Sequence, residues 1–509
     1  MLKFWESRPI RFSLPILAEI VSLCAIPPTL LPAQWSSDTG VNSTVSEANG
    51  QDFKMVPDGG GGAIFCWFVT RAFDDSVLYA QRLDHSGLTQ WATEGIIVGP
   101  AAGGFLGPPH QMASDGAGGA IVVWARQTSM GGPHNAYAVY TLYGQRISAE
   151  GGLLWAGGPV PLGSMVDDRT YDILTDGNGG VILTWSTIVG SNDYDIRAQR
   201  VSPDGQIQWG ANGIAITTAI GDQSDPKLAS DGAGGAIAVW QDYRTVSSFD
   251  ITTGHNLAFQ RVDPAGVTKW IANGVVVSTP SIRATKYNPW IIADGNNGAI
   301  AAWEDLRSDY YQIYSVRIGS DGTPAWQSGG VAVTAEESKQ SEPRLVSDAS
   351  GGAILTWLSL FYDDTITLTK YWDIRAQRLD AAGSALWSAP VTLARMKALG
   401  FRVPAIVQDA SHGAIIAWEN IPQGVAFYDV YAQRLDATGA KVWPGEREVI
   451  ADAFGDQFYP AMVSDGAGGA IVGWEDYRKG YDYGPGLYAT KITPTGPLPP
   501  PSSNGWFVY

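Results

Sequence analysis

The chain of 509 residues has few of the residue types on which several large protein classes depend. Two cysteines are too few for a disulfide framework, and the five histidines show no metal-ligand spacing. Lysine and arginine number 33 against 50 aspartates and glutamates, and the formal charge of −17 disfavours nucleic acid and anionic membrane surfaces as partners. The sequence also lacks a Gly-x-Ser-x-Gly elbow, a phosphate loop and an HExxH helix, so it offers no familiar catalytic motif.

Long apolar runs are missing as well, except at the N-terminus. Basic residues there precede a largely apolar run over residues 12–31, which leads into Leu31-Pro32-Ala33. This order is typical of a secretory signal peptide, residues 1–33, cut after Ala33. It predicts an extracellular or periplasmic protein. Because Pro15 and Glu19 interrupt the run, an amphipathic N-terminal helix that is retained is the alternative.

Glycine and tryptophan, by contrast, are abundant, with 61 and 20 residues, which argues against a helical bundle. Much of this excess belongs to a repeated motif, such as Asp115-Gly-Ala-Gly-Gly-Ala-Ile-Val-Val-Trp124. Glycine supplies the positive φ of a tight hairpin turn, and the apolar run predicts a strand covered on both faces. In each of eight copies the Asp and the Trp are nine residues apart: Asp58 and Trp67, Asp115 and Trp124, Asp176 and Trp185, Asp231 and Trp240, Asp294 and Trp303, Asp348 and Trp357, Asp409 and Trp418, Asp465 and Trp474.

A second motif follows the first, as in Tyr431-Ala-Gln-Arg434-Leu-Asp-Ala-Thr-Gly439-Ala-Lys-Val-Trp443. A catalytic group is needed once, whereas a structural group is needed in every repeat. We therefore interpret the repeated Trp and Arg as structural, with Trp packed between neighbouring units and Arg bonded to backbone or to the turn Asp. Arg and Trp keep a nine-residue separation in seven copies: Arg82 and Trp91, Arg146 and Trp155, Arg200 and Trp209, Arg261 and Trp270, Arg317 and Trp326, Arg378 and Trp387, Arg434 and Trp443.

The two motifs together predict four antiparallel strands, a to d, in each unit of 54 to 63 residues. Eight such units indicate an all-β, eight-bladed β-propeller over residues 34–496. Strand d is expected to begin near the second Trp. The last unit has Pro500 in place of that Trp, whereas Trp35 stands in a matching context near the start of the chain. We therefore predict that residues 34–46 form the outer strand of the last blade and close the ring.

A family resemblance rests on these motifs. Leu435-Asp-Ala-Thr-Gly439-Ala-Lys-Val-Trp443 is similar to the tryptophan-docking repeat of eight-bladed quinoprotein dehydrogenases and outer-membrane assembly scaffolds, but is one residue shorter between Asp and Gly. The whole unit more closely resembles uncharacterised secreted bacterial β-propellers with the same two repeats. This resemblance implies the fold and brings no established activity. A quinoprotein would show adjacent cysteines, and Cys24 and Cys66 are far apart, so no quinone cofactor is expected.

Binding residues are expected where the repeats differ. The interval from Trp to Arg, which holds the b–c loop, alternates between long and short, with long insertions at 127–143, 243–258 and 358–374. Variable loops on a rigid scaffold are a usual place for binding, although tolerated surface hairpins are the alternative. The predicted binding-face residues are His134, Tyr137, Tyr140, Tyr243, Asp250, His255, Tyr362, Asp363, Asp364, Tyr371, Trp372, Tyr481 and Tyr483.

These observations favour a non-catalytic binding or scaffold module with a protein or polysaccharide partner. The rival is a polysaccharide-active hydrolase or lyase, whose carboxylates would come from different blades. No cofactor is expected. The acidic pairs Asp74-Asp75, Asp167-Asp168 and Asp363-Asp364 are either calcium ligands or solvated loop charges. A proline-rich tail, residues 497–509, ends in an apolar tip that includes Trp506.

Overall fold

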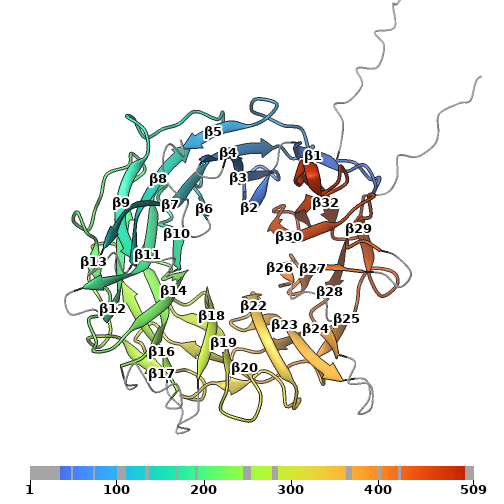
Figure 1. Ribbon diagram of the computed structural model, residues 1–509. Coiled ribbons are helices and arrows are strands. Elements are labelled where there is room, and N and C mark those ends of the chain that lie inside the picture. The colour runs from blue at the N-terminus through green and yellow to red at the C-terminus, as the bar shows by residue number, and fades with distance from the viewer. Residues whose placement is uncertain are drawn as a thin grey trace, which may run out of the picture.

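The protein is an eight-bladed β-propeller, as the repeats predict (Figure 1). The computed structural model describes residues 35–498 apart from 48–49, 73–74, 100–109, 132–136, 167–169, 190–192, 245–253, 278–284, 363–369, 398–402 and 422–425. The predicted signal peptide and residues 499–509 of the tail therefore lie outside the described residues. Over the described ranges, no helix has the length and apolar character that crossing a membrane requires.

Each blade is an antiparallel sheet with strand a nearest the central opening in Figure 1, and in blades 1 to 7 the strands follow one another along the chain. Blades 1 to 4 comprise β2 (Gln51–Pro57), β3 (Ala63–Ala72), β4 (Asp75–Leu83), β5 (Ile96–Gly99); β6 (Gln111–Ser114), β7 (Ala120–Gly131), β8 (Tyr137–Ile147), β9 (Val160–Val166); β10 (Tyr171–Thr175), β11 (Val181–Val189), β12 (Asp193–Val201), β13 (Ile214–Ala215); β14 (Gln223–Ser230), β15 (Ala236–Asp242), β16 (Asn256–Val262) and β17 (Val275–Val277).

Blades 5 to 7 repeat this arrangement, and blade 8 combines strands from both ends of the chain. They comprise β18 (Lys286–Ala293), β19 (Ala299–Asp305), β20 (Gln312–Ile318), β21 (Val331–Ala332); β22 (Lys339–Ser347), β23 (Ala353–Tyr362), β24 (Lys370–Leu379), β25 (Val391–Lys397); β26 (Ala405–Gln408), β27 (Ala414–Asn420), β28 (Asp429–Leu435), β29 (Glu448–Ala451); β30 (Gln457–Ser464), β31 (Ala470–Asp476), β32 (Gly486–Thr493), β33 (Gly496–Pro497) and β1 (Ser43–Ser46).

The a–b turn shows why the Asp-Gly-x-Gly-Gly motif is repeated. In blade 1 the buried Asp58 carboxylate accepts the backbone N–H groups of Gly60 at 2.8 Å and Gly62 at 2.7 Å. Gly59 and Gly61 have φ of 74° and 86°, a region that side chains rarely adopt. The turn delivers the chain into strand b, where the indole of Trp67 is completely buried.

The tryptophans near the end of strand b fill the space between neighbouring blades. In blade 3, Trp185 belongs to one apolar cluster with Leu162 and Met165 of β9, and its Nε1 donates to the carbonyl of Ser164 at 2.9 Å. Its ring lies so close to Gly163 that a side chain there would clash with it. Each of these indoles is at most 2% exposed, so together they form a ring of core residues: Trp67, Trp124, Trp185, Trp240, Trp303, Trp357, Trp418 and Trp474.

Neighbouring blades are also joined by an Arg and a second Trp that share one acceptor on the next blade. Arg82 pairs with Asp58 of its own turn at 2.9 Å, while its Nη1 and the Nε1 of Trp91 both donate to the carbonyl of Ala149 at 3.0 Å. The Trp lies in the c–d connection, so strand d begins later than expected: β5 starts at Ile96. The shared acceptors are Ala149, Pro203, Pro264, Ser320, Ala381, Ala437 and Pro494.

The ring closes as predicted, through the N-terminal strand. β1 pairs antiparallel with β32, with Ser43 opposite Ala489. Trp35 is buried and donates from Nε1 to the carbonyl of His85 at 2.9 Å, so it occupies on blade 1 the place that the other docking tryptophans occupy on their neighbours. Lys491 replaces the arginine of this blade and pairs with Asp465 at 3.2 Å. Figure 1 shows β1, the first described strand, beside β32 in this blade.

In two of the three long insertions, strands b and c continue into the insertion as a longer hairpin, and in the third they do not. The hairpins β7–β8 and β23–β24 continue into the insertions, whereas β15 ends at Asp242 and β16 begins at Asn256. Strand pairing stops there because Asp242 accepts hydrogen bonds from Trp240 Nε1 and from Arg244, and Arg244 also donates to the carbonyl of Asn273. Asp242 thus caps strand b and turns the chain aside.

We expect Arg146→Met to lower the free energy of unfolding by about 3 kcal/mol, because it leaves the buried Asp115 carboxylate without its cation. Urea denaturation of the variant and the wild type measures this loss. The matched control is Lys269→Met, which breaks the exposed pair with Asp263 and should cost less than about 1 kcal/mol. Equal losses in the two variants would contradict a structural role for the repeated arginine.

Candidate functional site

The innermost strands carry an irregularity that the regular repeat does not require. In five blades, strand a contains a register shift and a non-glycine residue with positive φ, six positions before the turn Asp. This backbone conformation is uncommon for such residues and persists only where the surroundings hold it. The five residues are Asp52, Asp225, Asn288, Glu342 and Tyr459, with φ between 50° and 57°.

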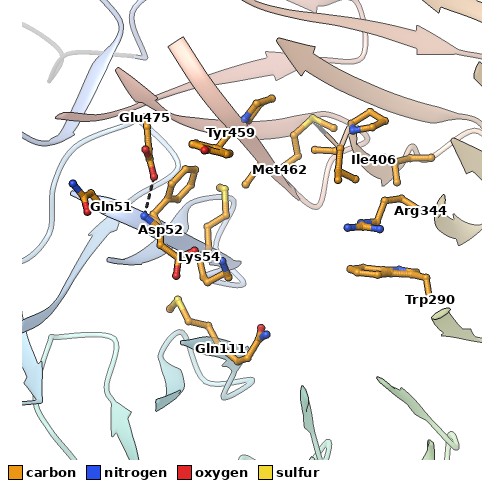
Figure 2. A pocket seen from close by; sticks show the side chains of 18 of the residues that line it. Gln51, Asp52, Lys54, Gln111, Trp290, Arg344, Ile406, Tyr459, Met462 and Glu475 are labelled. Atoms are coloured by element: carbon orange, nitrogen blue, oxygen red, sulfur yellow. Dashed lines mark hydrogen bonds and ion pairs between the residues drawn. The ribbon is translucent and has the colours of Figure 1, made fainter. Parts of the chain in front are cut away.

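In three blades the bulge is held by a glutamate of the preceding blade. Glu475 Oε1 accepts the backbone N–H of Asp52 at 2.8 Å, a bond drawn in Figure 2. Each of these glutamates directly follows the buried Trp of strand b, so the blade interface fixes the bulge. A bulge bends its strand and changes the direction in which nearby side chains point. Here these side chains lie around the axis of the ring. The other two pairs are Glu304 with Glu342 N, at 2.9 Å, and Glu419 with Tyr459 N, at 2.7 Å.

These strands enclose a cavity of about 1090 Å³ at the centre of the ring (Figure 2). Its lining comes from blades 1, 2, 5, 6, 7 and 8 and includes Glu475 and Tyr477, at the end of β31 that leads into the b–c loop. Gln51 lines it too and pairs with Phe68, again toward the b–c end of its blade. The cavity therefore lies toward the end of the ring that carries the b–c loops.

Two cations face this cavity from different blades. Lys54 Nζ forms an ion pair with Asp52 at 2.9 Å. Arg344 lies flat against Trp290, with Cζ 4.3 Å from the ring centroid, and both side chains point into the cavity in Figure 2. Burial lowers the pKa of Arg344, and the nearby Glu342 opposes this shift. Thioethers and aliphatic side chains, including Met55, Met112, Leu345, Ile406 and Met462, make up much of the remaining wall.

Aromatic rings lead from the cavity toward the outer surface of blade 8. The buried Phe458 contacts Tyr459 and Tyr477, with ring centroids 6.1 Å and 5.7 Å away, and Tyr477 contacts Tyr481 at 4.5 Å. Tyr459 and Tyr477 line the cavity, while Tyr459 is 51% and Tyr481 62% exposed. We call Tyr459, Phe458, Tyr477 and Tyr481 the aromatic strip. The aromatic strip places exposed aromatic surface beside the cavity.

Several residues predicted from the sequence lie near one another. Tyr481 and Tyr483 bound the short helix η2 (Tyr481–Tyr483), and both are exposed, so one end of the aromatic strip was among the predicted residues. Tyr243 and His255 stack with centroids 4.3 Å apart. Burial lowers the pKa of His255 to about 4, and its Nε2 contacts the carbonyl of Lys286. Neither Tyr243 nor His255 lines the axial cavity.

Two predicted loop residues are core residues instead. Tyr140 is 7% and Trp372 4% exposed. The prediction placed them on exposed loops, and it was wrong because the d strands of these two blades, at seven residues each, are longer than those of blades 1, 3, 4, 5 and 7 and cover this part of the hairpins. Tyr140 pairs with Met165 of β9, and Trp372 with Met396 of β25. Tyr371, on the neighbouring position of β24, is half-buried.

The repeated tryptophans of strand b take no part in the cavity. Their indole N–H groups are directed into the protein, where those of Trp240, Trp303 and Trp474 donate to an aspartate two residues later, at 2.8–3.0 Å. Trp357 makes the equivalent bond to Ser359 Oγ at 2.9 Å. These buried rings offer no surface to a ligand. The members absent from the cavity lining are Trp67, Trp124, Trp185, Trp240, Trp303, Trp357, Trp418 and Trp474.

The other predicted residues are placed only in part. Tyr137 begins β8 and Tyr362 ends β23. His134, Asp250, Asp363 and Asp364 lie outside the described residues, as do Asp74 and the pair Asp167-Asp168. Within the described ranges, no group of three or more His, Cys, Asp or Glu side chains could hold a metal ion. Calcium binding by the acidic pairs therefore stays a prediction.

The residues that build the cavity were missed from the sequence. Lys54, Gln111, Trp290 and Arg344 occupy the same repeat position, four residues before the turn Asp. A comparison of the repeats at that position would have shown a column that varies in chemistry while its neighbours stay apolar. Trp290 was also one of the few tryptophans outside both repeated motifs.

Comparisons with known proteins add the following. No family model matches the chain, and no curated protein matches it. Among solved structures, it is similar to a Penicillium chrysogenum alpha-L-arabinanase complexed with arabinobiose, at 12% identity and a TM-score of 0.38, over 64% of this chain and 92% of that one. It is also similar to NanB with Optactamide, at 8% identity and a TM-score of 0.36, over 88% and 69%. An endo-arabinase from Bacteroides thetaiotaomicron matches at 11% identity and a TM-score of 0.27, over 53% and 93%. Likenesses this distant carry no argument about function.

Proposed function

We propose that this protein is a non-catalytic glycan-binding propeller, which holds a segment of an oligosaccharide or polysaccharide in the axial cavity and against the aromatic strip. The observation that carries the proposal is the pair of exposed tyrosines, Tyr459 and Tyr481, on a strip of rings continuous with the cavity. Following the signal-peptide prediction, we place this activity outside the cytoplasm.

The chemistry of the strip and cavity favours a sugar over a folded protein. Sugar rings present C–H groups on their faces and hydroxyls at their edges, so they complement aromatic faces flanked by hydrogen-bonding groups. The cavity lining offers both, the rings of Tyr459 and Tyr477 and the side-chain amides of Gln51 and Gln111. Its volume of about 1090 Å³ suits a chain segment. A typical protein partner would instead bury roughly 800 Å² on each side.

Binding without hydrolysis is supported by the state of the cavity's carboxylates. Most glycoside hydrolases use two carboxyl groups that flank the scissile bond and are free to act on it. Here Asp52 is paired with Lys54 at 2.9 Å, and Glu475 holds the bulge through the N–H of Asp52 at 2.8 Å. Among the described residues, the two acidic side chains that line the cavity are therefore engaged in structural contacts.

We expect Tyr459→Ala and Tyr481→Ala each to weaken glycan binding about tenfold, because exposed aromatic anchors carry much of the energy of such contacts. A panel of short neutral and acidic oligosaccharides, titrated by calorimetry, identifies the ligand and measures the loss. Tyr310→Ala is the matched control: this tyrosine is 54% exposed and does not line the cavity.

The same panel separates the two function classes. Unchanged affinity in both strip variants would contradict the aromatic strip as the binding surface. Release of reducing ends, or of unsaturated products, from any oligosaccharide by the wild-type protein would contradict a non-catalytic role and favour the hydrolase or lyase.

A further inference from the structure

Arg344 differs in how it is held from the repeated arginines of the second motif. The repeated arginines form ion pairs of 2.7–3.0 Å with the aspartates of the a–b turns, as Arg434 does with Asp409. Arg344 Nη2 lies 3.7 Å from Glu342 Oε2, longer than a hydrogen bond. Its Nη1 donates to the carbonyl of Pro343 at 2.8 Å. A guanidinium carries five N–H donors, so much of its donor capacity is left for a ligand.

Trp290 fixes the direction in which Arg344 presents its donors. The guanidinium lies over the indole at 4.3 Å, an arrangement that restricts a long side chain and directs its planar fork into the cavity (Figure 2). A guanidinium held in this way loses less freedom when it binds a planar anion than one on a free side chain.

The surroundings strengthen the attraction of Arg344 for an anion. The wall near it is apolar, with Leu345, Ile406 and Met462, and the attraction between charges is larger where water is displaced. Across the cavity, Lys54 is already neutralised by Asp52. Arg344 has a more distant carboxylate partner, Glu342 at 3.7 Å, so among the described lining residues it is the stronger place for a negative charge, in a protein whose formal charge is −17.

We propose that the axial cavity selects a saccharide that contains a uronic acid residue. Arg344, held in place by Trp290, binds the carboxylate of that residue. The inference rests on the proposed glycan binding and names its ligand class. A guanidinium binds a carboxylate through two parallel hydrogen bonds, which a neutral hydroxyl cannot match. An extended polyanion is disfavoured by the acidic exterior, so a short acidic segment is the ligand that fits.

The test compares uronic acid oligosaccharides with their methyl esters, which keep the sugar shape and lose the charge. We expect the wild-type protein to bind the acid at least about tenfold more tightly than the ester. Arg344→Gln should abolish this preference, so that the acid and the ester bind with about equal affinity. Arg344→Lys keeps the charge but loses the planar guanidinium, so it should retain part of the preference for the acid. This variant keeps the test valid if the glutamine variant folds poorly. Arg447→Gln is the matched control, since Arg447 also lies 4.3 Å over an aromatic ring, that of Tyr431, and does not line the cavity.

The outcomes separate this inference from the proposed function. Equal binding of acid and ester, or an acid preference that survives in both Arg344 variants, would overturn the inference and leave glycan binding intact. Failure of the wild type to bind any saccharide would overturn both. Tighter binding of a glutamate-rich peptide than of the uronic acid oligosaccharide would also overturn the assignment to a sugar.

Discussion

Replacing Trp35 with alanine is expected to destabilise the whole ring, with a loss of about 3–5 kcal/mol in the free energy of unfolding. Trp35 is 4% exposed and packs against Gly87, and its Nε1 donates to the carbonyl of His85 at 2.9 Å. Every other blade is built from consecutive strands of the chain. Blade 8 instead depends on the pairing of β1 with β32, and Trp35 anchors this N-terminal segment, so its loss lets the ring open. Urea and thermal denaturation measure the effect.

The matched control is Trp326→Ala, which removes the equivalent docking tryptophan between blades 5 and 6. Trp326 is 6% exposed and donates to the carbonyl of Ala381 at 2.9 Å, so the local contacts removed are the same in kind. Because the chain runs continuously through these two blades, we expect a smaller loss there. A disulfide between cysteines introduced by Ser43→Cys and Ala489→Cys, which lie opposite one another, should restore stability to Trp35→Ala. Equal losses at the two tryptophans, with no rescue, would contradict a special role for closure.

Ring architecture was predictable because repeated residues make the same contacts each time. Asp58 holds its own turn and its own arginine, and Arg82 reaches a carbonyl of the next turn. Such contacts leave fixed spacings in the sequence, from which blade number, strand order and the closing segment follow. The interruption of the pattern in the last unit pointed to Trp35 for the same reason.

The cavity was not predictable, because it is built from residues at which the repeats differ. Lys54, Trp290 and Arg344 share a repeat position but no common residue type, so no recurring motif marks them, and only the variation at that position does. The bulges beside Lys54 and Arg344 depend on a neighbouring blade: Glu475 and Asp52, for example, are far apart in sequence and meet only when the ring closes. Tyr140 and Trp372 were misplaced for a related reason, since their burial depends on the length of the d strand that covers them.

Filling the cavity is expected to abolish glycan binding without unfolding the protein. Ala405 lines the cavity and occupies in blade 7 the repeat position that Trp290 occupies in blade 5. A tryptophan is therefore compatible with this position of strand a. We expect Ala405→Trp to weaken binding by at least about 100-fold, as calorimetry against the ligand from the panel would measure. Its melting temperature should stay close to that of the wild type.

The matched control is Ala265→Trp, an equally large change at an exposed c–d turn on the opposite end of the ring, which should leave affinity unchanged. The comparison also decides between the cavity and the long loops as the seat of binding. If Ala405→Trp keeps full affinity while Tyr481→Ala loses it, the ligand lies on the outer part of the aromatic strip and does not enter the ring. If neither variant changes affinity, binding belongs to the long b–c insertions of the other blades, because they lie at the same end of the ring but contribute neither residue.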